Sequence, residues 1–336
     1  MNKDFLAPRF VLLFAASIVI GMYSAGCVQT HSGSAGGLQM IEPGQPPVAI
    51  HPTVENARQA REAQPDVQSA TTWKGLYYHG GVNGIGVETS PRLYLVLWGS
   101  QWKGNDPSGE EARLDEFYRG VGGSPWLDSV RQYCQGVASG TRFCKGAGTP
   151  AGNPPGILAG VWYDNASPTP SGATQSQLAA EAVRAAHHFG NTTAQRNASA
   201  QYVIATAHGD HPSGYPKNYC AWHSWTSSSV GKVAYTNLPY ITDAGASCGA
   251  NFNGLGPKAG ITMVGGHEMA ESITDQFPNG GWLSSSGAEN GDKCAWIVSG
   301  QGASADTSLS TGTFAVQSLW SNAFNRDAGG CVMKYP

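Results

Sequence analysis

One stretch organises the rest of this chain: Gly265-Gly266-His267-Glu268-Met269-Ala270-Glu271-Ser272-Ile273-Thr274-Asp275. Let His267 mark zero on a helix of 3.6 residues per turn. Glu271 then lies about 40° round, Asp275 about 80° and Glu268 about 100°. Three carboxylates so placed repel each other unless they are solvated, protonated or gathered round a cation, and the adjacent imidazole favours a cation. The stretch therefore predicts either a metal-binding helix or an amphipathic helix whose acidic face contacts water.

The segments before this helix alternate between strand and helix patterns. Strands are predicted over 92–98, 157–163, 201–207 and 231–240, and helices over 110–121, 126–133 and 175–189. The side of the His267 helix away from the carboxylates carries small and apolar residues that suit packing on a sheet: Thr262, Met263, Gly266, Met269, Ala270 and Ile273. We therefore expect an α+β fold, with helices packed on a mixed, twisted sheet.

The N-terminus has the features of an export signal. Lys3 and Arg9 precede an apolar run over 10–23, which is too short to span a bilayer comfortably and ends at Ser24-Ala25-Gly26-Cys27. This ending resembles a bacterial lipobox, in which the cysteine becomes the lipidated first residue. Ordinary cleavage that leaves Cys27 unlipidated is the alternative. We expect a signal peptide over 1–26 and an exported protein of the cell envelope, either anchored to the membrane by a lipid on Cys27 or secreted.

Six cysteines remain after Cys27, an even number that suits an oxidising compartment. The simplest of the fifteen possible connectivities pairs them in sequence order: Cys134 with Cys144, Cys220 with Cys248, and Cys294 with Cys331. A thiolate metal site is the competing interpretation, but the chain has no Cys-x-x-Cys pair. We therefore expect a disulfide-stabilised fold.

Composition separates a tether from a single folded domain. Residues 27–72 are rich in Gly, Pro, Gln, Ser and Ala, which predicts a flexible tether with at most a short helix over 53–62. The folded domain is expected over 73–336. Only 13% of the residues are charged and the net charge is −3, so the chain lacks the basic footprint of a nucleic-acid-binding protein.

More candidate ligands lie outside the helix. Glu289 follows His267 by 22 residues and Asp292 comes three residues later, which suits a third, carboxylate ligand and a second carboxylate beside it. The alternative is a polar turn, because Ser-Ser-Gly-Ala-Glu-Asn-Gly-Asp is rich in turn-forming residues. Histidines 208, 211 and 223 are further candidates for a ligand or for a hydrogen bond to a developing oxyanion, and His223 is the strongest of them.

The order of elements resembles that of zinc-dependent metallopeptidases of the zincin type. Those proteins have a twisted sheet, an edge strand that binds extended substrate, and then a metal-binding helix with the motif His-Glu-x-x-His. Here Lys232–Leu238 stands at the place of the edge strand and His267-Glu268 at the start of the motif. Glu271 replaces the second histidine, and a carboxylate there is a harder, negatively charged ligand.

A second resemblance covers the chain from about Gln201 onward. The elements Cys220-Ala221-Trp222-His223, His267-Glu268-Met269-Ala270-Glu271 and Glu289-Asn290-Gly291-Asp292-Lys293-Cys294 look like those of the plant phosphate-induced protein 1, or Exordium, family and its bacterial relatives. That family has similar elements in the same order and at similar separations. The resemblance implies secretion and a place at the cell surface, without implying an activity.

Together these features predict a metallohydrolase, a peptidase that acts on a peptide or a cell-surface polymer. His267, Glu271, Glu289 and Asp292 would hold Zn²⁺ or another divalent ion. Glu268 would take a proton from a metal-bound water, and His223 would assist catalysis. The rival hypothesis is a non-catalytic binding or structural protein of the cell surface that keeps the zincin framework. In that case an aromatic binding surface is expected from Trp222, Trp225, Trp282 and Trp296.

Overall fold

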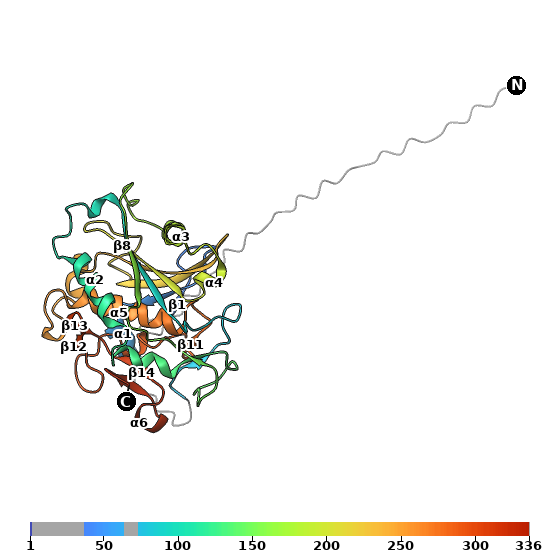
Figure 1. Ribbon diagram of the computed structural model, residues 1–336, viewed down its shortest axis with the longest axis vertical. Coiled ribbons are helices and arrows are strands. Elements are labelled where there is room, and N and C mark those ends of the chain that lie inside the picture. The colour runs from blue at the N-terminus through green and yellow to red at the C-terminus, as the bar shows by residue number, and fades with distance from the viewer. Residues whose placement is uncertain (2–36, 64–72, 336) are drawn as a thin grey trace. The chain divides into compact units, whose positions relative to one another are not determined.

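The computed structural model describes residues 1, 37–63 and 73–335. Its main sheet, to which the strands labelled β1 and β8 in Figure 1 belong, has seven strands in the order β1-β2-β9-β10-β8-β4-β7. β10, β8, β4 and β7 pair in parallel, whereas β9 is antiparallel to β10, β2 to β9 and β1 to β2. The sheet is therefore mixed, as predicted. Its strands are β1 Gly37–Gln39, β2 Val48–His51, β4 Arg92–Trp98, β7 Leu158–Asp164, β8 Ala200–Thr206, β9 Ala221–Ser228 and β10 Gly231–Leu238.

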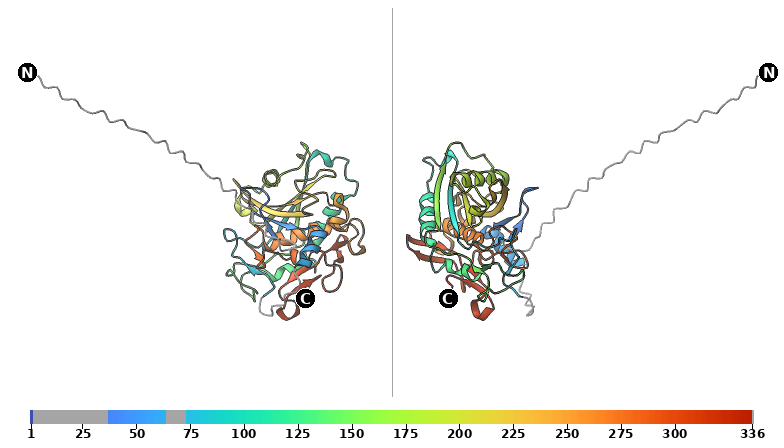
Figure 2. Two further views of the ribbon diagram at one scale, coloured as in Figure 1. Left: turned by 180° about the vertical axis from the view of Figure 1, so that it is seen from behind. Right: turned by 45° about the vertical axis from the view of Figure 1, so that its right-hand side comes forward.

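Helices cover both faces of this sheet, with α3 on one face and α2 and α5 on the other (Figure 2). The described α-helices are α1 Val54–Ala63, α2 Glu110–Val121, α3 Gln175–His188, α4 Ala194–Asn197, α5 Ala259–Thr274 and α6 Phe324–Asp327. α3 begins with a capping box, in which the Thr174 side chain accepts from the amide of Gln177 and the Gln177 side chain accepts from the amide of Thr174. Shorter 3₁₀ helices are η1 Ser100–Trp102, η2 Leu127–Gln132, η3 Ile241–Cys248, η4 Phe252–Gly254 and η5 Asp292–Cys294.

Small two-stranded sheets complete the fold. They pair β3 Tyr77–Tyr78 with β11 Trp282–Leu283, β5 Cys134–Gln135 with β6 Thr149–Pro150, β12 Ala305–Leu309 with β13 Gly312–Val316, and β14 Leu319–Ser321 with β15 Gly330–Val332. β13 lies against α5: Thr262 donates from its hydroxyl to the carbonyl of Ala315. The C-terminal part of the chain therefore helps to enclose the helix.

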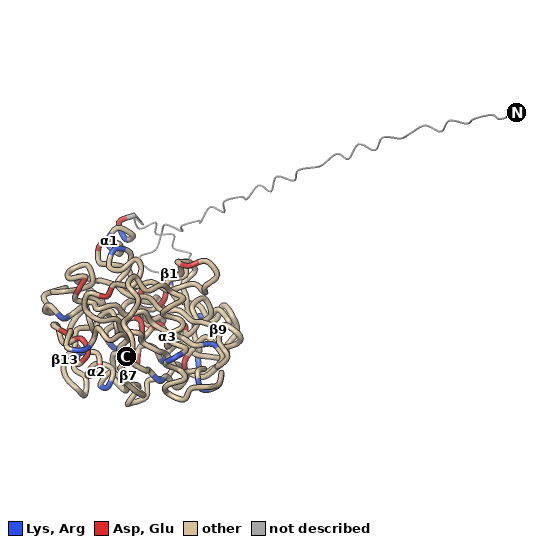
Figure 3. Tube along the Cα trace, turned by 90° about the horizontal axis from the view of Figure 1, so that it is seen from above, with Lys and Arg blue, Asp and Glu red and all other residues tan. Residues whose placement is uncertain are grey.

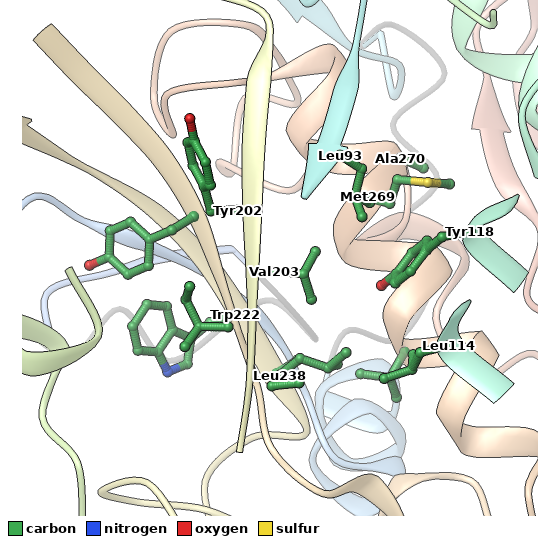
Figure 4. Packing of buried hydrophobic residues seen from close by; sticks show 14 of the residues in the cluster. Leu93, Leu114, Tyr118, Tyr202, Val203, Trp222, Leu238, Met269 and Ala270 are labelled. Carbon is green, nitrogen blue, oxygen red and sulfur yellow. The ribbon is translucent and has the colours of Figure 1, made fainter. Parts of the chain in front are cut away.

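The buried core covers both faces of the sheet, one of them facing α5. Val203 of β8 points toward α5, which carries Met269, whereas Tyr202 and Trp222 lie on the opposite side of the sheet (Figure 4). This arrangement follows from the alternation of side chains along a strand. All of α5 is buried, including its acidic side. The interpretation of that side as a solvated surface is therefore wrong.

Several elements match their predicted ranges. β4 and α2 have the predicted bounds, and β7, β8, β10 and α3 lie within two residues of theirs. The helix predicted over 126–133 is a 3₁₀ helix, η2, over Leu127–Gln132. β9 was not predicted, because its sequence Ala-Trp-His-Ser-Trp-Thr-Ser-Ser carries polar residues at positions that the structure buries.

The N-terminal boundary of the folded domain is wrong for part of the expected tether. Residues 37–39 and 48–51 form strands of the main sheet, and the remaining described residues up to 63 include α1. Val48, Ala49 and Ile50 are buried although this segment has little apolar periodicity. Pairing with β9 stabilises the segment, and that long-range contact leaves no local pattern in the sequence. The predicted signal peptide and Cys27 lie outside the described residues.

The expected edge position of Lys232–Leu238 is also wrong. These residues belong to β10, which is hydrogen-bonded on one side to β8 and on the other to β9. β9 in turn pairs with β2 through residues 221–223, so β10 does not present a free edge. The prediction failed because β9 and β2 add to the sheet outside β10, and strand order is not encoded in the pattern of a single strand.

The three predicted disulfides are confirmed. Cys134 pairs with Cys144, Cys220 with Cys248, and Cys294 with Cys331. Such bonds are typical of proteins from an extracellular or otherwise oxidising environment. Within the described part of the chain, no helix combines the length and the apolar character needed to cross a bilayer.

Candidate metal centre

Two glycines set the position of α5. A Cβ at Gly265 would lie 2.8 Å from the Tyr118 hydroxyl oxygen, and one at Gly266 would lie 3.0 Å from the Phe117 ring. Both aromatic residues belong to α2, so the glycines permit close packing of the two helices. The polar side of α5 consequently faces the strands β9 and β2 and the segment around Glu289.

Seven side chains with metal-ligand chemistry meet at this polar side. All are fully buried except Asp292, which is 5% exposed. They form three overlapping groups: His51 with His267 and Glu268, His223 with Glu271 and Glu289, and His267 with Glu271 and Asp292. Within each group the potential ligand atoms lie within 4.8 Å of one another. The structure therefore brings together every residue predicted for the site, and adds His51.

Gln317 orients the imidazole of His267. Its amide nitrogen donates to the carbonyl of Gly291, which turns its amide oxygen toward Nδ1 of His267 at 3.2 Å. With the proton on Nδ1, the lone pair of Nε2 faces Glu271 Oε2 at 3.0 Å and Asp292 Oδ1 at 3.8 Å. A metal-binding histidine usually donates a hydrogen bond to an oxygen from the ring nitrogen that does not bind the metal.

Glu268 orients His223 in the same way. Nδ1 of His223 lies 3.1 Å from Oε2 of Glu268, and Nε2 lies 3.6 Å from Oε1 of Glu289. His223 comes from β9, where alternation places it on the α5 face while Trp222 points to the other face. Glu289 therefore groups with His223 and Asp292 with His267, whereas the sequence assigned both carboxylates to a single set.

The segment from Glu289 to Asp292 approaches α5 through a glycine. A Cβ at Gly291 would lie 2.7 Å from Nδ1 of His267 and 2.9 Å from Oε1 of Glu271. The amide of Asp292 donates to that same Glu271 oxygen at 2.7 Å, and the side chain of Asn290 donates to the hydroxyl of Thr274 at 2.7 Å. These contacts attach the acidic segment to the helix, so it is more than a solvated polar turn.

His51 was missed by the sequence analysis. Its ring is stacked on that of His267 with centroids 3.8 Å apart and 4° between the planes, and the indole of Trp296 lies on it at 4.9 Å. It belongs to Val-Ala-Ile-His within the expected tether, where no motif marks it. The only local signal is that His51 ends a short run of apolar residues.

The buried donor atoms are largely unpartnered. Among the described residues, no hydrogen bond is made by Nε2 of His223 or His267, by either carboxylate oxygen of Glu289, by Oε1 of Glu268, by Oε2 of Glu271 or by Oδ1 of Asp292. Nor does a described Lys or Arg form an ion pair with these four carboxylates. Burying unpaired charge costs far more than the net stability of a protein. A divalent cation fits this set of donors, because it compensates their charge and uses their free lone pairs.

The pKa values of the buried groups in the centre also favour a bound cation. Burial raises the pKa of Glu289 and of Asp292 well above the ordinary range. Burial opposes the charged form of His267, yet the neighbouring Glu271 carboxylate raises the pKa of that imidazole to about 9. Protons therefore take the place of positive charge when no cation is bound, and a cation would displace them.

The remaining candidates lie elsewhere or have other contacts. The Asp275 carboxylate accepts from the amides of Asn279, Gly280 and Gly281, so it caps the turn after α5. His208 and His211 form a separate, half-exposed cluster with Asp243. The expected aromatic surface is not formed: Trp222, Trp282 and Trp296 are buried and Trp225 is partly buried.

Comparison with protein-family models, with curated proteins and with solved structures found no match to this chain.

Proposed function

We propose that the protein binds a divalent cation, zinc or a harder ion, in the centre around α5 and that it is a zincin-like metallohydrolase acting on peptides. The observation that carries the proposal is the set of buried, unpartnered donor atoms on His223, His267, Glu271, Glu289 and Asp292. Neighbouring ligands of a cation with bonds of about 2.0–2.2 Å lie roughly 3 to 3.5 Å apart. The separation of 3.0 Å between His267 Nε2 and Glu271 Oε2 suits this geometry.

Such an ion supplies Lewis acidity toward a carbonyl and lowers the pKa of water. The chain supplies the base. Glu268 holds His223 with Oε2 and keeps Oε1 unpartnered, so this second oxygen is available to accept a proton from an attacking water. His223 stays positioned by the same carboxylate. Glu268 is thus proposed to have two roles, as base and as the partner that orients His223.

A closed, stabilising metal centre in a cell-surface binding protein is the second candidate. Full burial favours it, because structural metal sites are closed whereas catalytic sites keep a position open to water or substrate. In that case the ion contributes to folding stability without turnover. Both candidates fit an exported protein. The lipid anchor on Cys27 and the relation to the Exordium family remain part of what we propose.

Elemental analysis of the full chain tests cation binding. We expect the wild type to hold at least one equivalent of a divalent metal and His267→Ala to lose it, with His208→Ala as the matched histidine control that keeps it. Equal metal content in all three proteins, or none in the wild type, would contradict the metal centre.

Turnover then separates the two candidates. We expect cleavage in a peptide-library assay by metal-loaded wild type, and a loss of several orders of magnitude in Glu268→Gln with retained metal. Retained metal without any cleavage in the wild type would favour the stabilising role. The same holds if cleavage is still absent after residues 48–51 have been released from β9.

A further inference from the structure

β2 extends the main sheet beside the metal centre. It pairs antiparallel with β9 in a register that sets Ala49 opposite His223 and His51 opposite Ala221. The amide of Cys220 donates to the carbonyl of His51 at 2.9 Å, and the hydroxyl of Ser224 donates to the carbonyl of Pro47 at 2.8 Å. The backbone of residues 47–51 is therefore bound as an added strand, the mode by which many proteins bind extended peptides.

This added strand also covers the centre. His51 points to the α5 face, because it alternates with Ile50, and there its ring stacks on His267. Both ring nitrogens of His51 are buried and unpartnered among the described residues. His51 belongs to the donor group that includes Glu268, the carboxylate proposed as the base. A peptide group in this place would lie next to that carboxylate.

The residues after β2 are attached mainly through backbone carbonyls. Trp296 donates from its indole to the carbonyl of Pro52 at 2.8 Å, and Arg61 donates to the carbonyl of Ala295 at 2.9 Å. Among residues 54–62 of α1, whose burial the structure describes, only Ala57 is fully buried, and the helix presents both acidic and basic residues (Figure 3). A helix that buries so little apolar surface contributes little stability to its own docking.

The other face of the strand has space for a side chain. Ile50 lies opposite Trp222 and lines a cavity of about 550 Å³ together with Ile41, Ala173 and Tyr219. Side chains at successive positions of a bound strand would thus meet different surroundings, the cavity for one and the metal centre for the next. That alternation is a basis for sequence preference.

We propose that the edge of β9 is a binding site for an extended polypeptide and that residues 48–51 of the chain occupy it themselves in this closed form. The inference rests on the proposed function, because it names the substrate class of the same metal centre and the way in which that centre is kept inactive. The ligand is an unfolded or extended peptide with an apolar side chain at the position of Ile50. The enzyme is latent until residues 48–51 leave β9.

A chain that can be cut between α1 and β3 tests this. A specific protease sequence is inserted between Gln64 and Thr72 of the full chain, and the same sequence inserted in the exposed loop Lys145–Gly148 provides the control. The probe is a fluorescent peptide of residues 45–53. Its control is the peptide with Ile50 and His51 exchanged, which keeps composition but sends each side chain to the wrong face.

Fluorescence anisotropy should show the probe binding to the protein cut between Gln64 and Thr72, and not to the uncut chain or to the loop-cut control. The exchanged peptide should bind at least about tenfold more weakly. Transfer of metal to a chelator should be at least about tenfold faster after the same cut. The uncut variant His51→Ala should also release metal faster than the wild type, which provides a readout that does not depend on the cut.

No binding of the probe to the protein cut between Gln64 and Thr72, with unchanged metal release there and in His51→Ala, would overturn the inference and make β2 a permanent part of the sheet. Equal binding of the two peptides would overturn the proposed register. Probe binding by a protein that holds no metal would leave the peptide site standing and would refute the proposed function instead.

Discussion

The molecule contains two histidine–carboxylate clusters with nearly the same chemistry and opposite surroundings. In one, Asp243 accepts from His208 at 2.6 Å, from His211 at 3.1 Å and from the amide of Gly209 at 2.7 Å. The two imidazoles of that cluster are 44% and 42% exposed. In the other, around His267 and Glu271, the side chains are buried and carry unpartnered donor atoms.

The difference shows that residue type alone does not indicate a metal centre. Two imidazoles and the amide of Gly209 satisfy Asp243, so its cluster is stable without an ion, and pairs with half-exposed partners contribute little to stability. The buried cluster has more carboxylates than its histidines can compensate and no access to water. Burial converts the same residue types into a set of unpartnered donor atoms that a cation would fit.

The largest expected contrast comes from neutralising one carboxylate in each cluster. Glu271→Gln keeps shape but removes the anionic oxygen shared by two donor groups, so bound metal should fall at least about tenfold. Its unfolding free energy should fall by about 3–5 kcal/mol, the usual cost of breaking a buried charged network. Asp243→Asn should keep its metal content. Elemental analysis and urea unfolding measure both, and similar losses in the two variants would erase the distinction between the clusters.

A pair of glycines tests the packing of the two clusters. Gly291→Ala would place a methyl group 2.7 Å from Nδ1 of His267, so it should reduce metal content and cost about 1–3 kcal/mol by overpacking. Gly209 has φ +79° and open space around its Cα. Gly209→Ala should cost about 1–2 kcal/mol from backbone strain and leave metal unchanged. If the first variant binds metal like the wild type, the close approach of residue 291 is unimportant.

Glu110 sharpens the comparison, because it is buried and yet hydrogen-bonded. Its carboxylate accepts from the amides of Ile241 and Thr242. Burial raises the pKa of Glu110 to about 7 from an ordinary value of 4.5. The folded state thus binds this proton more tightly, so the stabilising contribution is complete below pH 4.5 and is lost as pH rises through about 7.

Glu110→Gln removes that titration. Between pH 4.5 and 7 the unfolding free energy of the wild type should fall relative to the variant, by up to about 1.4 kcal/mol per pH unit. Urea unfolding at several pH values measures the difference. A constant difference across this range would show that Glu110 titrates normally and that its hydrogen bonds compensate its burial.

The smallest effect is expected in the exposed cluster. The double variant His208→Ala, His211→Ala should lower the unfolding free energy by under about 1 kcal/mol and leave metal content unchanged, because the pair is half exposed. Thermal unfolding and elemental analysis suffice. A loss of metal from this variant would mean that the exposed cluster is the true ion site.

Prediction from the sequence succeeded where the signal was local. The spacing of His267 and Glu271 sets both on one helical face, and helix geometry needs only the neighbouring residues. Sequential pairing of the six cysteines was also correct. The sequence ranked His223 above His208 because His223 belongs to the element that resembles the Exordium family, but it did not show that His223 is buried and His208 exposed, since burial depends on what packs above each side chain.

The composition, the helical spacing of the acidic residues and the cysteine count thus determined the α+β class and the disulfide framework, and the sequence motifs named six of the seven side chains that the structure groups, all except His51. Only the tertiary structure decided that the acidic face is buried, that Glu289 groups with His223 and Asp292 with His267, and that His51 lies over the centre. The physical reason is that these facts depend on strand order and register. The pairing of β2 with β9 joins residues some 170 positions apart, and no local pattern records it.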